Sequence, residues 1–174
     1  MSLENSSDTR KISYKFCFYK HLDFLIGKNI DLRGTMKEAS KPTVYLAGDT
    51  QSGWQTRVCK AIQDIQLLDP SKQDLADPKK LTRWGFQAIR KSDVVLAYLE
   101  KEDQNGHALA LELGYAKALG KTILLVQEHG AEQDKYSQAV REVADFCFDS
   151  LGEAVSYLVL SFLFEQNARE KNKG

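Results

Sequence analysis

DVVLAYLEKEDQNGHALALELGYAKALGKTILLVQ, residues 93–127, joins two apolar runs through a polar loop and a helical segment. Residues 93–100 and 121–127 are short runs rich in Val, Leu and Ile, a pattern typical of buried strands. Residues 106–119 show helical spacing, and Gly120 follows them where a helix commonly ends. A strand, a helix and a second strand in succession predict a βαβ unit with parallel strands.

The same alternation continues on both sides of this stretch. The predicted further strands are TVYLAG (43–48), QLLDP (66–70) and DFCFD (145–149), and the predicted further helices are 53–65, 81–91, 133–143 and a last helix to about Phe164, with a polar loop at 71–80. Ser150 and Glu153 form a capping box at the start of that last helix. The fold class is therefore α/β, a doubly wound five-stranded parallel sheet with helices on both faces.

The composition of the sequence divides the chain into three parts. We expect an N-terminal extension at 1–41, partly disordered or interface-forming, then one domain at 42–166 and a charged tail at 167–174. Apolar and polar residues alternate over 12–18, which predicts a strand. The sequence leaves open whether that strand joins the main sheet, contacts a partner or does neither.

Composition excludes several classes of function. Lys and Arg together number 24, as do Asp and Glu, so no basic surface indicates nucleic acid or an anionic membrane as partner. The longest apolar run, 157–164, is too short to span a bilayer. The N-terminus resembles no secretory signal, and Cys17, Cys59 and Cys147 are widely spaced without metal-ligand spacing. We expect a cytoplasmic protein with reduced thiols, no metal and no cofactor.

Three loops follow the carboxyl ends of predicted strands, where ligands bind in open α/β sheets. They are 48–53, 69–80 and 100–106. None contains a dinucleotide fingerprint or a P-loop.

Glu112 is out of place in its helix. On a helical wheel it is flanked by Ala and Tyr residues and lies at the centre of an apolar arc that includes Leu109, Leu111 and Leu113. A buried carboxylate without partners is costly. Either a backbone amide or an Arg satisfies it, or it faces a cleft where its charge is used, for example as a nucleophile. Its position near the ligand edge favours the cleft.

Three segments together resemble the nucleoside 2-deoxyribosyltransferases and their N-glycosidase relatives. They are VYLAGDTQSGWQ (44–55), AIRKSDVVLAYLE (88–100) and LALELGYAKALGK (109–121), in an order and spacing that cover residues 42–160. The resemblance implies a flavodoxin-like fold. It also implies cleavage or transfer at the N-glycosidic bond of a 2′-deoxynucleoside or its 5′-monophosphate, through a covalent deoxyribosyl ester.

The resemblance also implies roles for particular residues. Glu112 is the nucleophile and Tyr45 lies beside it as the second catalytic residue, with plain core packing as the alternative explanation of Tyr45. The expected substrate-binding residues are Gly48, Asp49, Gly53, Trp54, Asn105, Gly106 and Ala108. A Trp at the start of a helix is more often part of the core than a base-stacking platform. Members of the family commonly complete the site across a subunit interface, so a homodimer or higher homo-oligomer is expected.

Two positions depart from the family pattern. Relatives have an acid eight residues before the Asp that corresponds to Asp93, where it handles the departing base, and this chain has Gly85. Relatives have Gly where this chain has Ala108. Asp69, Asp74 or Asp77 in the preceding loop is a possible substitute for the acid, whereas Asp93 itself is expected to be structural.

Two other interpretations stay open. The chain is a nucleoside- or nucleotide-binding module with weak or no catalysis, or it is an assembly protein whose contact surface lies within residues 11–34. The sequence does not distinguish purine from pyrimidine, nucleoside from nucleotide, or transfer from hydrolysis.

Overall fold

The computed structural model describes residues 41–99, 106–128 and 135–171. Residues Lys41–Val159 form one compact unit, and the last helix from Leu160 onward belongs to a second. Predictions for residues 1–40, including the strand at 12–18, lie outside the described residues.

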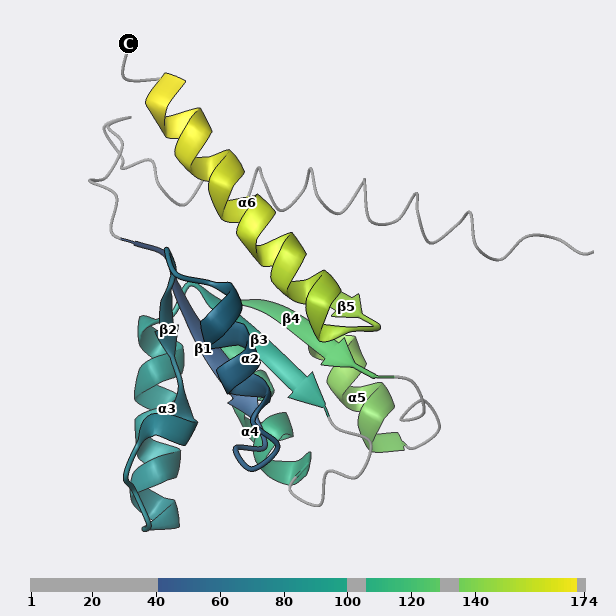
Figure 1. Cartoon of the computed structure of the whole chain (residues 1–174). Helices are drawn as coiled ribbons and strands as arrows, with labels where there is room; N and C mark the ends of the chain where they lie inside the picture. The colour runs from purple at the N-terminus through teal and green to yellow at the C-terminus, as the bar shows by residue number, and fades with distance from the viewer. Residues whose placement is uncertain (1–40, 100–105, 129–134, 172–174) are drawn as a thin grey trace, which may run out of the picture. The chain divides into compact units, whose positions relative to one another are not determined.

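Strands and helices alternate along the described chain (Figure 1). In order they are β1 (Thr43–Gly48), α2 (Trp54–Ala61), β2 (Gln66–Leu68), the 3₁₀ turn η1 (Pro70–Lys72), α3 (Pro78–Lys91), β3 (Val94–Leu99), α4 (Gly106–Ala118), β4 (Thr122–Gln127), α5 (Lys135–Val143), β5 (Phe146–Phe148) and α6 (Leu151–Lys171).

The five strands form one parallel sheet in the order β2-β1-β3-β4-β5. This is the doubly wound, flavodoxin-like order, so the prediction of the fold is confirmed. The central strands β3 and β4 are buried along their whole length, which is why their sequences are continuous apolar runs without alternation.

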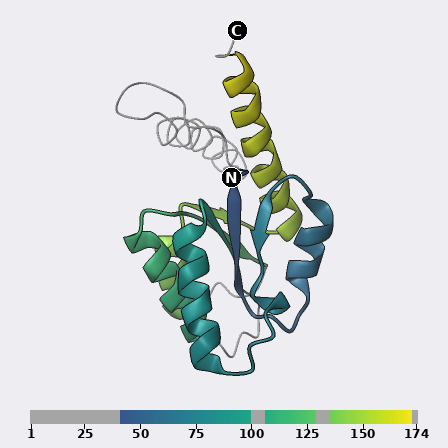
Figure 2. The ribbon, with the colours of Figure 1, turned by 90° about the vertical axis from the view of Figure 1, so that its left-hand side faces the viewer.

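Helices cover both faces of the sheet. Figure 2 shows α3, α4 and α5 on one side and α2 on the other. On the α4 side, Leu109, Leu113 and Ala116 pack against strand residues in one continuous core. On the α2 side, Trp54 and Val58 are fully buried, and Tyr157 of α6 contacts the rings of β5. These two cores bury the alternate side chains of each strand.

Two carboxylates hold the starts of strands in place. Asp93 Oδ2 accepts a hydrogen bond of 2.8 Å from the Thr43 amide at the start of β1. Asp145 Oδ2 accepts one of 2.9 Å from the Ile123 amide of β4. Asp93 therefore has the structural role expected for it, at the amino edge of the sheet and away from the ligand edge.

Three helices differ by several residues from the prediction. The α2 helix ends at Ala61 and not at Ile65, since the backbone is already extended at Ile62. The α3 helix begins at Pro78 and not at Leu81, because Asp77 caps the Lys79 amide and Pro is well suited to the first turn. The α6 helix is capped by Ser150 as predicted, through a 3.3 Å bond from the Glu153 amide, but ends at Lys171 and not near Phe164. No described helix is both long and apolar enough to cross a membrane.

Candidate active site

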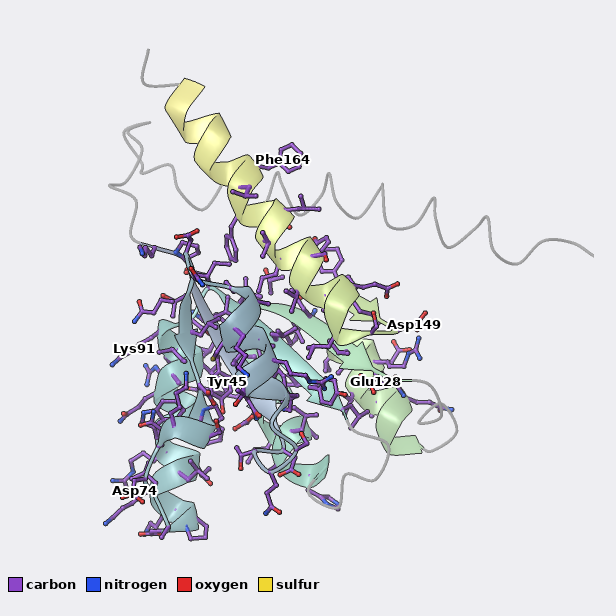
Figure 3. All side chains as sticks on the ribbon, in the orientation of Figure 1. Tyr45, Asp74, Lys91, Glu128, Asp149 and Phe164 are labelled. Carbon is purple, nitrogen blue, oxygen red and sulfur yellow. The ribbon has the colours of Figure 1, made fainter. Side chains whose placement is uncertain are left out.

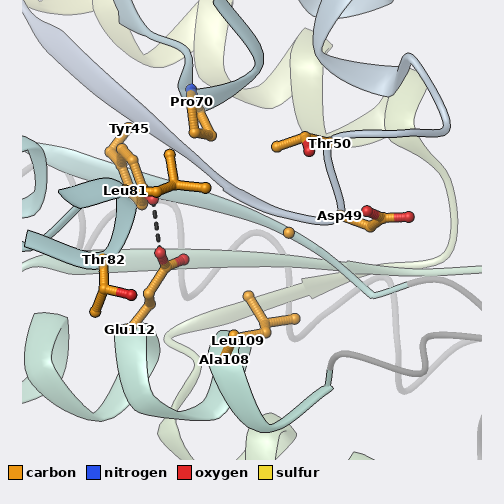
Figure 4. A pocket seen from close by; sticks show the side chains of 10 residues that line it. Tyr45, Asp49, Thr50, Pro70, Leu81, Thr82, Ala108, Leu109 and Glu112 are labelled. Atoms are coloured by element: carbon orange, nitrogen blue, oxygen red, sulfur yellow. Dashed lines mark hydrogen bonds between the residues drawn. The ribbon is translucent and has the colours of Figure 1, made fainter. Parts of the chain in front are cut away.

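A tyrosine from strand β1 and a glutamate from helix α4 form a hydrogen-bonded pair. The Tyr45 hydroxyl donates a hydrogen bond of 2.7 Å to Glu112 Oε1 (Figure 4). Tyr45 is 1% exposed, so its hydroxyl is fixed by the packing of β1 beneath α3 and α4. The pair joins residues 67 positions apart in the sequence.

The helix α4 presents Glu112 at the edge of its buried face. The buried residues Leu109, Leu113 and Ala116 are centred about 70° from Glu112 on the wheel. Leu111 is 57% exposed, so the prediction that Glu112 lies at the centre of the apolar arc is wrong. An edge position lets the carboxylate be half-buried and still reach a cavity.

The carboxylate of Glu112 is strongly affected by its surroundings. Burial raises its pKa from 4.5 to about 7, and the hydrogen bond from Tyr45 partly opposes this rise. The pKa of Tyr45 is raised too, by burial and then by the neighbouring carboxylate, so Tyr45 remains a neutral donor. The salt bridges between described residues are Lys72–Asp69 and Lys117–Asp145, and neither involves Glu112. Within the described part of the chain, therefore, no ion pair with Arg holds this side chain.

Glu112 lies in the wall of a cavity of about 190 Å³ at the ligand edge of the sheet. This volume is below the roughly 300–1,000 Å³ of pockets for drug-sized ligands, so the described walls enclose space for a sugar-sized group. Figure 4 shows Tyr45 and Leu81 on one side and Asp49 and Thr50 on another. The lining residues are Tyr45, Gly48, Asp49, Thr50, Pro70, Leu81, Thr82, Ala108, Leu109 and Glu112.

The predicted substrate-binding residues occupy different places in the structure. Gly48, Asp49 and Ala108 line the cavity together with Glu112 and Tyr45. Gly53 is not among the described lining residues and is the left-handed residue before α2, with φ of 75°. Gly106 begins α4. Asn105 lies outside the described residues.

Trp54 belongs to the core. Its ring is 0% exposed and stacks on Tyr98 at a centroid distance of 5.2 Å. Its Nε1 donates to the Asp49 carbonyl at 2.9 Å, and Gln55 Nε2 donates to the same oxygen at 2.8 Å. The prediction of base stacking is therefore not supported, and the alternative of core packing is what the structure shows. Trp54 instead fixes the loop that carries Asp49.

Position 48 has no room for a side chain. Its φ is +140°, and a Cβ atom there would lie 2.6 Å from the Tyr98 carbonyl oxygen. The glycine lets β1 end and the chain turn into the loop of Asp49 and Thr50 beside the cavity.

Gly85 lies against the Tyr45–Glu112 pair. A Cβ atom on Gly85 would be 3.1 Å from Glu112 Oε1 and 3.1 Å from the Tyr45 hydroxyl oxygen. The position that departs from the family pattern is thus at the centre of the site, on the buried face of α3.

The three candidate substitutes for an acid are placed elsewhere. Asp69 accepts from the Ser71 amide and hydroxyl and caps η1, and Asp77 caps α3. Asp74 is exposed at the periphery of the protein, whereas Tyr45 is interior (Figure 3). None of the three lines the cavity.

The sequence did not single out five of the wall residues, namely Thr50, Pro70, Leu81, Thr82 and Leu109, although Thr50 lies in the loop 48–53 expected at the ligand edge. Leu81 and Thr82 lie in the first turns of α3, which crosses toward α4. The loop 69–80 was expected at the ligand edge, which was a signal for Pro70. Among the described residues, no group of His, Cys, Asp and Glu side chains is arranged to hold a metal ion.

The sequence and the fold of this chain are similar to those of known proteins. Residues 41–130 match the family described as "Nucleoside 2-deoxyribosyltransferase like". The chain belongs to this family. The match includes Tyr45, Gly85 and Glu112, so the resemblance of the three sequence segments is confirmed. No curated protein sequence matched the chain.

Two solved structures share the fold of this family member. A CMP N-glycosidase from Clostridium botulinum aligns with a TM-score of 0.50 and 17% identity, over 68% of this chain and 98% of its own. A 2-deoxyribosyltransferase from Leishmania mexicana aligns with a TM-score of 0.50 and 24% identity, over 68% of this chain and 97% of its own. At these identities the likeness establishes the shared fold.

Proposed function

We propose that the protein cleaves or transfers the N-glycosidic bond of a 2′-deoxynucleoside or its 5′-monophosphate, through a covalent deoxyribosyl ester on Glu112. One observation carries this proposal: a tyrosine-bonded carboxylate lies in the wall of a sugar-sized cavity at the ligand edge. Membership of the family supports it. The two structures of the same fold are named as an N-glycosidase and a deoxyribosyltransferase, which is consistent with either cleavage or transfer of the N-glycosidic bond.

The reaction has two steps. In the first, Glu112 Oε2, the oxygen that does not accept the Tyr45 bond, forms a bond to C1′ of the sugar while the electron pair of the C1′–N bond moves onto the base. In the second, water or another base attacks C1′, and the carboxylate of Glu112 departs. Exclusion of water from the cavity decides between transfer and hydrolysis.

Tyr45 keeps the nucleophile in place. Its hydrogen bond occupies Oε1 and favours the ionised carboxylate, which is the form that attacks carbon. Gly48, Asp49 and Ala108 border the space for the sugar and base. We expect reaction rates to rise with pH through about 7 as Glu112 ionises.

The test is release of free base from 2′-deoxynucleosides and their monophosphates, followed by chromatography. Glu112→Gln keeps the shape of the side chain and removes the nucleophile, while Glu142→Gln on the exposed face of α5 is the matched control. We expect turnover by wild type and the control and a loss of at least about 10³-fold in Glu112→Gln. Trapping with a slow 2′-fluoro analogue and mass spectrometry should locate the sugar on Glu112. Equal release by wild type and Glu112→Gln would refute the proposal.

A second candidate function is a nucleoside- or nucleotide-binding module with weak or no catalysis. Gly85 favours it, because the residue that faces the Tyr45–Glu112 pair from α3 offers no acid to the departing base. Calorimetric binding of a deoxynucleoside without base release or sugar trapping would support the module over the enzyme.

The proposal extends to the oligomeric state of the protein and its cellular compartment. We propose a cytoplasmic homo-oligomer: the resemblance of the three sequence segments to the family implies the oligomer, and the widely spaced cysteines favour the cytoplasm. Light scattering after size exclusion measures the mass of the assembly. A monomeric mass under the conditions of turnover would contradict the homo-oligomer without affecting the chemistry at Glu112.

A further inference from the structure

The cavity contains two carboxylates from different parts of the fold. Glu112 comes from α4, and Asp49 comes from the loop that follows β1 (Figure 4). The Asp49 backbone is held by Trp54 and Gln55, and Asp49 Oδ1 accepts from the Gln51 amide at 3.3 Å. The ten described lining residues include these two acids and no Lys, Arg or His. This wall is complementary to positive charge.

Two polar side chains beside the nucleophile already donate their hydrogens, and the other hydroxyl of the wall, on Thr50, is too weak an acid to protonate a departing base. The Tyr45 hydroxyl donates to Glu112, and the Thr82 hydroxyl donates to the Pro78 carbonyl at 2.9 Å. Gly85 lies beside the Tyr45–Glu112 pair, and its side chain is a hydrogen atom that cannot act as an acid. A neutral base leaves a sugar readily only when it is protonated as it departs. A base that is already cationic needs no such proton.

Resting on the function proposed above, we propose that the preferred substrates are nucleosides whose base carries a positive charge, such as N-alkylated purine or pyridinium nucleosides. Asp49 and Glu112 select the charge, and Gly85 is compatible with it because no acid is needed at that position.

The chemical step balances without an added proton. Glu112 Oε2 bonds to C1′ while the C1′–N bond breaks, and its electron pair neutralises the cationic ring. Water then adds to C1′, the ester bond breaks to restore the carboxylate, and the proton of the water passes to solvent. A cation in the cavity also favours the ionised form of Glu112, whose pKa is raised by burial.

The experiment compares N7-methylated 2′-deoxyguanosine, which is cationic at mildly acidic pH, with unmethylated 2′-deoxyguanosine. The methylated nucleoside also loses its base faster without enzyme. The ratio of kcat/KM for the two substrates is therefore compared with the ratio of their spontaneous rates at the same pH. The proposal expects an enzymatic ratio at least as large as the spontaneous one. An enzyme that protonates the departing base would reduce the ratio by about 10²–10⁴-fold, and that result would overturn the proposal.

Two variants assign the effect to residues. Asp49→Asn should lower kcat/KM for the methylated substrate about tenfold more than for the unmethylated one, because it removes one of the two charges. Gly85→Asp should narrow the ratio of kcat/KM for the two substrates relative to Gly85→Ala, which places the same Cβ atom beside the pair but adds no acid. An unchanged ratio in Asp49→Asn would overturn the assignment of charge selection to Asp49, even if the variants of Gly85 fail to fold.

The outcomes separate this inference from the proposed function. Glu112-dependent release of base from both substrates with a reduced ratio overturns only the preference for cations. Failure to release base from either substrate in a Glu112-dependent manner overturns both.

Discussion

Replacement of Glu112 by Gln should stabilise the protein at neutral and alkaline pH while it abolishes the proposed chemistry. Gln has nearly the same shape and still offers an oxygen to the Tyr45 hydroxyl, whose bond to Glu112 is 2.7 Å long. The substitution therefore removes the buried charge and little else. A carboxylate whose folded pKa is raised weakens the fold when it ionises.

The size and pH range of this effect follow from the pKa. Burial raises the pKa of Glu112 from 4.5 to about 7, and each pKa unit corresponds to about 1.4 kcal/mol. The folded state binds the proton more tightly than the unfolded state. Stability from this group is therefore complete below pH ~4.5 and is lost as the pH rises through about 7. Above that range Glu112→Gln should exceed wild type by about 3 kcal/mol in free energy of unfolding.

Urea unfolding followed by circular dichroism across this pH range measures the difference. The advantage of Glu112→Gln should be near zero at the acidic end and should grow toward its full value above neutrality. The control Glu142→Gln, on an exposed position, should differ from wild type by no more than about 0.5 kcal/mol at each pH. A Glu112→Gln protein that is less stable than wild type above neutral pH would show that the carboxylate is satisfied in the fold, and the reasoning would fail.

Three further predictions follow from the same structure. Tyr45→Phe removes the hydrogen bond that lowers the pKa of Glu112, so the pH–rate profile should shift to higher pH and kcat/KM at neutral pH should fall about tenfold. A pH–rate profile that does not shift would contradict this role of the Tyr45 hydroxyl. Gly48→Ala should lower the free energy of unfolding in urea by about 3 kcal/mol, because φ is positive there and the new Cβ would lie 2.6 Å from the Tyr98 carbonyl oxygen. Gly152→Ala, with open space around it, should change that free energy by no more than about 1 kcal/mol, and equal effects of the two substitutions would argue against the contact. Asp93→Ala should cost about 1–2 kcal/mol in the same assay without changing the pH–rate profile, since its carboxylate holds only the start of β1.

Much of the fold could be predicted from local sequence pattern. The apolar runs at β1, β3 and β4 and the helical spacing between them are properties of neighbouring residues, and they predicted a parallel α/β sheet. Glu112 also stood out locally, as a carboxylate among apolar residues in a helix. The start of α3 was missed because the cap at Asp77 lies in a segment whose composition indicates a loop.

The sequence by itself determined the strands, the class of fold, the family and the residue that is out of place in α4. The family resemblance implied that Tyr45 lies beside Glu112, but only the tertiary structure showed the hydrogen bond between them. Only the tertiary structure decided that Trp54 is buried and that Gly85 faces the pair. Periodicity reports which side of an element is apolar, because that depends on residues a few positions apart. Contacts among β1, α3 and α4 depend on strand register and helix packing between distant segments, and no local pattern encodes those distances.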